Sequence, residues 1–182
     1  MAHTELDGMY QEILMEHSRD PHNFGVLDAP DLKADGFNPL CGDKICIHAQ
    51  LSHEGPEKAG TDKISSIRFK GQACSICMAS ASILTDEAMG KTLPELQALI
   101  QNFRDLMQDK KQPSDFEGDI TCLAGVKKFP VRIKCALLPW TTLKEALDER
   151  GQKGAATGAK TPRAALLPQT PLRPPAQSLP KA

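Results

Sequence analysis

Apolar residues recur at helical spacing near the start of the chain and alternate further along. Residues 7–18 carry apolar side chains at spacings of four and five, which predicts a helix. Residues 21–42 contain prolines and glycines at short intervals and are expected to form an irregular stretch. Two partly alternating stretches follow at 44–51 and 63–70. The turn-rich connection between them predicts an antiparallel hairpin.

The next part of the chain changes to helical patterns. Small residues at 75–89 predict a helix for which Ser75 is the expected N-cap. Thr92-Leu-Pro-Glu95 has the form of a capping box, and helically spaced apolar residues follow it. A short helix is expected at 119–126 and the last helix at 133–147.

The composition changes after Arg150. Residues 151–182 contain six prolines, seven alanines and five basic residues, with no acidic residue. We therefore expect a domain at 1–150 followed by a Pro/Ala-rich basic tail at 151–182 that is disordered. The formal net charge of −1 gives no reason to expect a nucleic-acid partner.

The cysteines and the N-terminal residues indicate a reducing compartment. The first seven residues lack the basic and apolar regions of a signal peptide, and the chain has no apolar run long enough to span a membrane. We expect a cytoplasmic protein without a membrane partner. The six cysteines are then better suited to metal binding or thiol chemistry than to disulfides.

Three short motifs each present a cysteine in a setting that suits metal or sulfur chemistry. They are Cys41-Gly-Asp43, Gly71-Gln-Ala-Cys74 and Arg132-Ile-Lys-Cys135. Three thiolates and the carboxylate of Asp43 make four ligands, the number that zinc or an iron site favours. Carboxylate oxygen is a weaker ligand for a soft metal than sulfur is. A site with one carboxylate is therefore suited to exchanging the group that it binds. Each motif alone also fits a loop cysteine or a buried cysteine.

Local context favours a thiolate at two of these positions. Cys74 follows a predicted strand and precedes a predicted helix, whose dipole lowers the pKa of a thiol at its start. Cys135 follows Arg132 and Lys134, whose positive charges also stabilise a thiolate.

The remaining cysteines and the histidines give weaker indications. Cys74 and Cys77 form a C-x-x-C pair, but the preceding hairpin is not a thioredoxin context, and Cys77 is expected to be a neighbour on the helix face. Cys46 is interpreted as structural or incidental, and the role of Cys122 stays open. The histidines show no two-histidine metal spacing and are expected to be surface or core residues.

Taken together, these segments resemble the NifU-like scaffold family of iron–sulfur cluster assembly, most closely its SufU branch. The resemblance covers about residues 6–150. It rests on Tyr10-Gln-Glu-Ile-Leu, Pro21-His-Asn-Phe-Gly25, Asn38-Pro-Leu-Cys41-Gly-Asp43, Phe69-Lys-Gly-Gln-Ala-Cys74-Ser-Ile, Ala79-Ser80, Met89-Gly90-Lys91 and Arg132-Ile-Lys-Cys135-Ala-Leu-Leu-Pro-Trp140. The IscU branch carries a histidine immediately before the last cysteine, where this chain has Lys134. The segment 118–129 also looks like the extra segment of the SufU branch.

The resemblance implies an α+β fold, in which a small antiparallel sheet is covered by helices and a metal site lies at one end. It implies that the ligands are Cys41, Asp43, Cys74 and Cys135, and that the metal is zinc, or alternatively iron or a transient iron–sulfur cluster. The tail and Cys77 lie outside the pattern of the family.

Two functions in cluster assembly follow from this resemblance. In one, the protein is a scaffold for nascent clusters. In the other, it is a zinc-dependent sulfur acceptor in which Cys41 takes sulfur from a SufS-like cysteine desulfurase. Other cluster assembly proteins are further expected partners. Whether the protein acts as a sulfurtransferase-like enzyme or as a non-enzymatic scaffold stays open. A structural zinc module for protein contact is the alternative.

Overall fold

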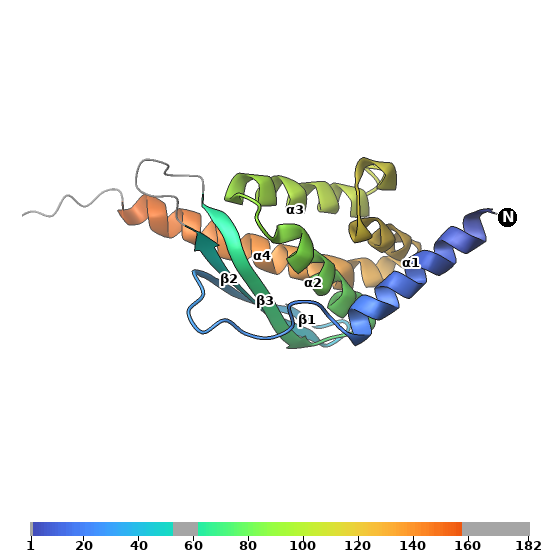
Figure 1. The fold of residues 1–182 in the computed structure, drawn as a ribbon, viewed down its shortest axis with the longest axis horizontal. Helices are drawn as coiled ribbons and strands as arrows, with labels where there is room; N and C mark the ends of the chain where they lie inside the picture. Colours follow the sequence, from blue (N-terminus) through green and yellow to red (C-terminus); the bar gives the residue numbers. More distant parts are fainter. Residues whose placement is uncertain (1, 53–61, 158–182) are drawn as a thin grey trace, which may run out of the picture.

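The computed structural model describes residues 2–52 and 62–157. Its strands are β1 (Leu32–Asn38), β2 (Asp43–Ser52) and β3 (Lys63–Gln72), and its helices are α1 (Ala2–Arg19), α2 (Ser75–Ala88), α3 (Leu93–Met107), the short 3-10 helices η2 (Pro113–Asp115) and η3 (Asp119–Lys128), and α4 (Pro130–Thr157). The sheet is antiparallel in the order β1-β2-β3, and helices cover one side of it (Figure 1). This is the α+β arrangement that the family resemblance implied.

Strand register brings several chain segments to one end of the sheet. Asn38, the last residue of β1, pairs with Asp43, the first residue of β2. Lys44 pairs with Gln72 at the end of β3, directly before α2 begins. The turn from β1 to β2 and the link from β3 to α2 therefore lie at the same end (Figure 1).

The hairpin of β2 and β3 confirms the sequence prediction, but the irregular stretch expected at 21–42 is wrong in its second half. This part contains β1, an edge strand whose sequence LKADGFN has few apolar residues. Gly36 in β1 lies against α4: a Cβ atom there would clash with the Thr142 hydroxyl and come within 3.2 Å of Leu138 Cδ1. Close packing on α4, rather than hydrophobic alternation, thus places this strand.

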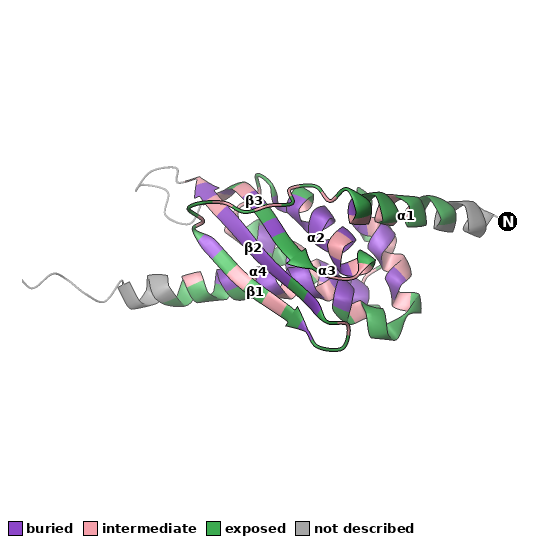
Figure 2. Cartoon of the chain, turned by 90° about the horizontal axis from the view of Figure 1, so that it is seen from below, coloured by how far each residue is buried: buried purple, intermediate pink, exposed green. Residues whose placement is uncertain are grey.

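The core lies between the sheet and helices α2, α3 and α4. The alternating residues Ile45, Ile47, Ala49 and Leu51 of β2 are all buried. Figure 2 shows buried residues concentrated along β2, with exposed ones on β1. On the helical side, Trp140 is fully buried and stacks on Phe103 at 4.1 Å between ring centroids. Its indole N–H donates to Ser80 Oγ at 2.9 Å, so the ring's one polar group is satisfied.

Helices α2 and α4 both begin near the end of the sheet where the cysteine motifs meet. The N-cap of α2 is Cys74 and not Ser75 as expected, and its side chain makes no capping hydrogen bond. Helix α4 begins at Pro130 and continues through Pro139. Because proline has no N–H, Pro139 cannot donate to the carbonyl of Cys135, four residues earlier. In contrast, the capping box of Thr92 and Glu95 in α3 is present as predicted.

Helix α4 also runs past the domain boundary expected at residue 150. It extends to Thr157, and the rest of the expected tail, 158–182, lies outside the described residues. Among the helices in the described ranges, none is long and apolar enough to cross a membrane.

The close approach of β1 and α4 can be tested at Gly36. We expect Gly36→Ala to destabilise the fold by about 1–3 kcal/mol, because the added methyl group overpacks the contact and displaces the Thr142 hydroxyl from the Leu138 carbonyl. Urea unfolding measures this change. Gly8→Ala in α1 is the control, since nothing lies within 4 Å of a Cβ atom there. Equal stability of both variants would contradict the packing argument.

Candidate metal centre

Four chain segments deliver the predicted ligands to the end of the sheet. Cys41 lies in the turn between β1 and β2, Asp43 opens β2, Cys74 caps α2, and Cys135 lies in the second turn of α4. One ligand atom each from Cys41, Asp43 and Cys135 lie within 4.8 Å of one another. Residues separated by up to 94 positions in the sequence therefore meet at one point.

Cys74 joins this group through Asp43. Its backbone N–H donates to Asp43 Oδ1 at 2.7 Å, and its thiol is one of the hydrogen-bonding groups that lower the pKa of the Asp43 carboxyl. The amide belongs to the first N–H groups of a helix, which have no partner within the helix and attract negative charge. The same carboxylate thus orders the start of α2 and connects Cys74 to the site, although the Cys74 sulfur is not part of the group whose ligand atoms all lie within 4.8 Å of one another.

The closest pair of sulfur atoms joins the turn to α4. The Cys135 thiol donates to Cys41 Sγ at 3.2 Å, and both residues are free cysteines. Cys135 is fully buried, whereas Cys41 is only partly buried. Cys41 is therefore the thiol of this pair that an incoming group can reach.

Asn38 is a contributor to the site that the sequence analysis missed. It is 95% buried, and its Nδ2 group lies 3.2 Å from Asp43 Oδ2 and 3.4 Å from Cys135 Sγ. Its Oδ1 accepts the backbone N–H of Leu40 at 3.2 Å, which shapes the turn that carries Cys41. An asparagine directly before a proline is typical of a turn. That local signal does not show that the side chain also reaches α4.

Hydrogen bonds shift the pKa values of the two buried residues Asp43 and Cys135 in opposite directions, whereas burial acts to raise both. Burial acts to raise the pKa of Asp43, but hydrogen bonds from Cys74, Cys135 and Asn38 outweigh it and lower the pKa below its usual value. Burial raises the pKa of the Cys135 thiol, and its hydrogen bonds to Cys41 and Asp43 raise it further. Without a metal, the site therefore holds a charged carboxylate beside a protonated thiol.

Arg132 places a positive charge at the open side of the site. Its Nη1 group lies 3.7 Å from Cys41 Sγ, and its side chain also hydrogen-bonds to Cys135, beside which the sequence analysis placed this cation. Both Arg132 and Lys134 are exposed. A guanidinium in this position stabilises negative charge on the sulfur of Cys41.

The other three cysteines lie elsewhere in the core. Cys77 is buried in α2 and Cys122 in η3, and burial raises the pKa of both thiols. Cys46 lies on β2 with its sulfur 3.1 Å from His48 Nε2, and burial together with Asp35 raises its pKa to about 11. The pKa of Cys135 is raised as well, so protonation alone does not distinguish these three thiols from a ligand. The expectations for Cys46 and Cys77 stay predictions.

The donor set fits zinc. Thiolates and a carboxylate are both zinc ligands, and four such donors complete a tetrahedral site. Asn38 provides outer hydrogen bonds to Asp43 and Cys135, of the kind that ordinarily hold metal ligands in place.

Comparison with known proteins identifies the family of the chain. A model of the NifU-like N terminal domain matches residues 9–136. The chain belongs to this family. The resemblance drawn from the motifs is thus confirmed at the level of the family.

Relatives within the family carry two different names. The chain is 38% identical over 148 residues to the iron-sulfur cluster assembly scaffold protein IscU of Streptococcus pyogenes serotype M1, covering 81% of this chain and 87% of that protein. It is 38% identical over 145 residues to the zinc-dependent sulfurtransferase SufU of Bacillus subtilis strain 168, and the match covers 79% of this chain and 92% of that protein.

A solved structure shares the fold of this NifU-like chain. It is described as an iron-sulfur cluster assembly scaffold protein for the SUF system from Fervidobacterium islandicum AW-1. Its TM-score is 0.67 at 30% identity, and the match covers 75% of this chain and 94% of that chain.

We expect Asn38→Ala to lower zinc affinity by about 10- to 100-fold, because the Asp43 carboxylate and the Cys135 sulfur lose a shared hydrogen-bond donor. Competition with a chromophoric chelator measures the affinity. Asn102→Ala in α3 is the control and should leave the affinity unchanged. If both variants bind zinc as the parent protein does, Asn38 does not support the site.

Zinc affinity should fall as the pH is lowered from 8 to 6. The Cys135 pKa is raised in the metal-free protein, so zinc must displace its proton, and acid favours the protonated form. The loss is about tenfold per pH unit for each proton released. Calorimetry in buffers of different ionisation enthalpy counts these protons. A pH-independent affinity would show that the thiols are already ionised.

Proposed function

We propose that this NifU-like protein functions in iron–sulfur cluster assembly as a zinc-dependent sulfur acceptor. Cys41, Asp43, Cys74 and Cys135 are its zinc ligands, and Cys41 is the residue that takes sulfur from a SufS-like cysteine desulfurase. The proposal rests on one observation above all, the contact of the accessible Cys41 with the buried Cys135 at 3.2 Å.

Zinc, when bound, would keep the cysteines as thiolates, the form that is nucleophilic. The protein itself contributes the placement of the ligands. Three of them are held by a strand or by helices, whereas Cys41 lies on the turn 39–42, next to Gly42 with a φ angle of 72°. Cys41 is therefore the ligand whose departure would disturb the fold least.

The chemical step needs only a thiolate and a persulfide. The Cys41 thiolate attacks the outer sulfur of a cysteine persulfide on the desulfurase and forms a new S–S bond. The S–S bond of the desulfurase breaks, and its electron pair leaves with the desulfurase cysteine as a thiolate. The terminal proton stays on the transferred sulfur, so charge and atoms balance. Arg132, beside Cys41, stabilises the negative charge of the attacking sulfur.

Exposed apolar side chains next to these residues suit a protein partner. Leu40, beside Cys41, is 64% exposed, and Val131, beside Arg132, is 65% exposed. Single exposed apolar side chains are common on protein surfaces, so it is their place beside Cys41 and Arg132 that supports a docking role. A thiol-based transfer of this kind also requires a reducing compartment such as the cytoplasm.

A scaffold role is the second candidate, because three thiolates and a carboxylate can also hold iron and sulfide. The similarity to the scaffold protein IscU of Streptococcus pyogenes supports it. The chain is equally identical to the zinc-dependent sulfurtransferase SufU of Bacillus subtilis, so sequence identity does not separate the two roles. Lys134, in the position of the IscU histidine, favours the acceptor role.

Cys41→Ser should abolish stimulation of the desulfurase, with at least a 100-fold loss of sulfur transfer, because a hydroxyl is not a nucleophile at neutral pH. Alanine release from cysteine under reducing conditions measures turnover, and thermal unfolding confirms an intact fold. The matched control is Cys46→Ser on the same strand pair, which should retain stimulation. Full stimulation by Cys41→Ser would refute the acceptor role of this residue.

Asp43→Ala separates the candidate functions. In a structural zinc module the variant should lose zinc and stability together, whereas in a scaffold it should retain a bound cluster for longer. Zinc and sulfide analysis of the anaerobically purified parent protein completes the test. One zinc without sulfide supports the acceptor, and iron with equivalent sulfide supports the scaffold.

A further inference from the structure

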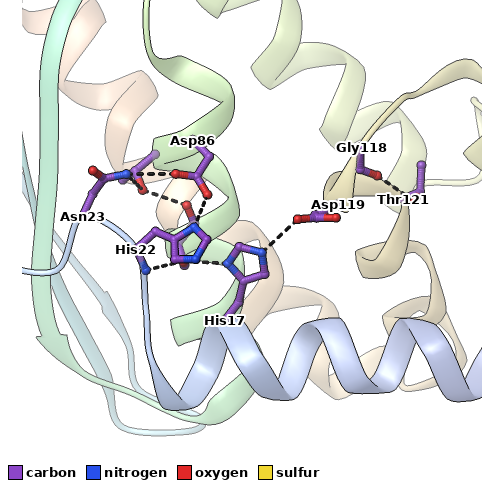
Figure 3. Close-up of polar contacts among 9 residues, drawn as sticks. His17, His22, Asn23, Asp86, Gly118, Asp119 and Thr121 are labelled. Carbon is purple, nitrogen blue, oxygen red and sulfur yellow. Dashed lines mark hydrogen bonds and ion pairs between the residues drawn. The ribbon is translucent and has the colours of Figure 1, made fainter.

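A second group of metal-ligating side chains lies away from the cysteines. His17 at the end of α1, His22 in the following loop and Asp86 in α2 each place one ligand atom within 4.8 Å of the other two (Figure 3). Asp86 follows Cys74 by twelve residues of one helix, roughly 18 Å along its axis. The two groups are therefore separate sites.

The hydrogen bonds of His17 leave one nitrogen suited to a metal. His17 Nε2 lies 3.1 Å from the Asp119 carboxylate and so carries the proton, which leaves the lone pair on Nδ1. Nδ1 therefore accepts the hydroxyl proton of Ser82 at 2.8 Å, while the same Oγ accepts the backbone N–H of His22. A metal ion at Nδ1 would replace the Ser82 hydrogen bond. A carboxylate behind an imidazole is the arrangement that orients histidine ligands in metal sites.

The other two donors are similarly oriented. Asn23 Nδ2 donates to Asp86 Oδ1 at 3.0 Å, which turns Oδ2 toward His22. Asp86 Oδ2 lies 2.6 Å from His22 Nδ1, and the rings of His22 and His17 are 4.6 Å apart between centroids (Figure 3). His17 is buried, whereas the side chains of His22 and Asp86 are 52% and 42% exposed. The two exposed groups can therefore close on an ion that His17 anchors.

The position of His17 suggests what such an ion would do. Between residues 8 and 19, where α1 side chains are described, His17 is the one buried residue. Its contacts reach α2 through Ser82 and η3 through Asp119. A polar residue, and not an apolar one, is thus the most buried attachment of this helix to the domain.

We propose that His17, His22 and Asp86 form a second, independent site for zinc or a similar divalent transition metal, which fixes the end of α1 on α2. Imidazole and carboxylate donors suit such ions, and three protein ligands leave one position for water. The site does not depend on the cysteine centre or on the proposed sulfur transfer.

Zinc content of the full chain, dialysed against buffered free zinc, tests the proposal. The parent protein should bind one equivalent in the nanomolar range, at the cysteine centre, and a second in the micromolar range. His22→Ala and Asp86→Asn should each lose the second equivalent and keep the first, which also reports an intact fold. His22→Ala preserves the backbone hydrogen bond to Ser82. Asp148→Asn, an exposed residue of α4, is the control and should bind both equivalents.

Hydrogen exchange gives an independent readout. Micromolar zinc should slow amide exchange in the last turn of α1 in the parent protein and not in the two variants. A single equivalent in the parent protein, or a second one that survives both substitutions, would overturn the proposal and leave a purely hydrogen-bonded contact. Loss of the first equivalent alone would concern the cysteine centre and not this site.

Discussion

The Asp43 carboxylate is the group on which the arrangement of the cysteine centre depends. One oxygen accepts the amide of Cys74 and the other accepts Asn38, so a single buried side chain connects β1, β2 and the start of α2. A buried carboxylate is stable only when hydrogen bonds compensate for its lost solvation. That requirement forces the three segments to meet, and the sulfur atoms are placed as a consequence.

Helix α4 completes the site from the opposite direction. Its position is set by packing: Trp140 stacks on Phe103 and binds Ser80, while the Thr142 and Leu138 side chains lie against Gly36. Cys135 precedes Trp140 by little more than one helical turn. The same packing that forms the core therefore brings the Cys135 sulfur to Cys41. A substitution in the core near Trp140 would consequently alter the geometry of the cysteine centre.

The site combines rigid and accessible parts. Asp43 and Cys135 are fully buried, whereas Cys41 lies on a turn beside the exposed Arg132. This difference is what a sulfur acceptor requires, because the fold must survive while one thiolate changes partners. His17 makes a comparable polar connection farther along α2, where it joins α1 to α2 through Ser82 and to η3 through Asp119.

Local patterns in the sequence determined the β2–β3 hairpin, the capping box of α3 and the candidate ligands, because alternation, capping and motif spacing act between near neighbours. The sequence analysis missed β1, because its place depends on the fit of Gly36 to α4 and not on an apolar pattern. It also missed Asn38, the contact of Arg132 with Cys41, and the grouping of His17, His22 and Asp86. These contacts join residues far apart in the chain, so only tertiary packing decides them.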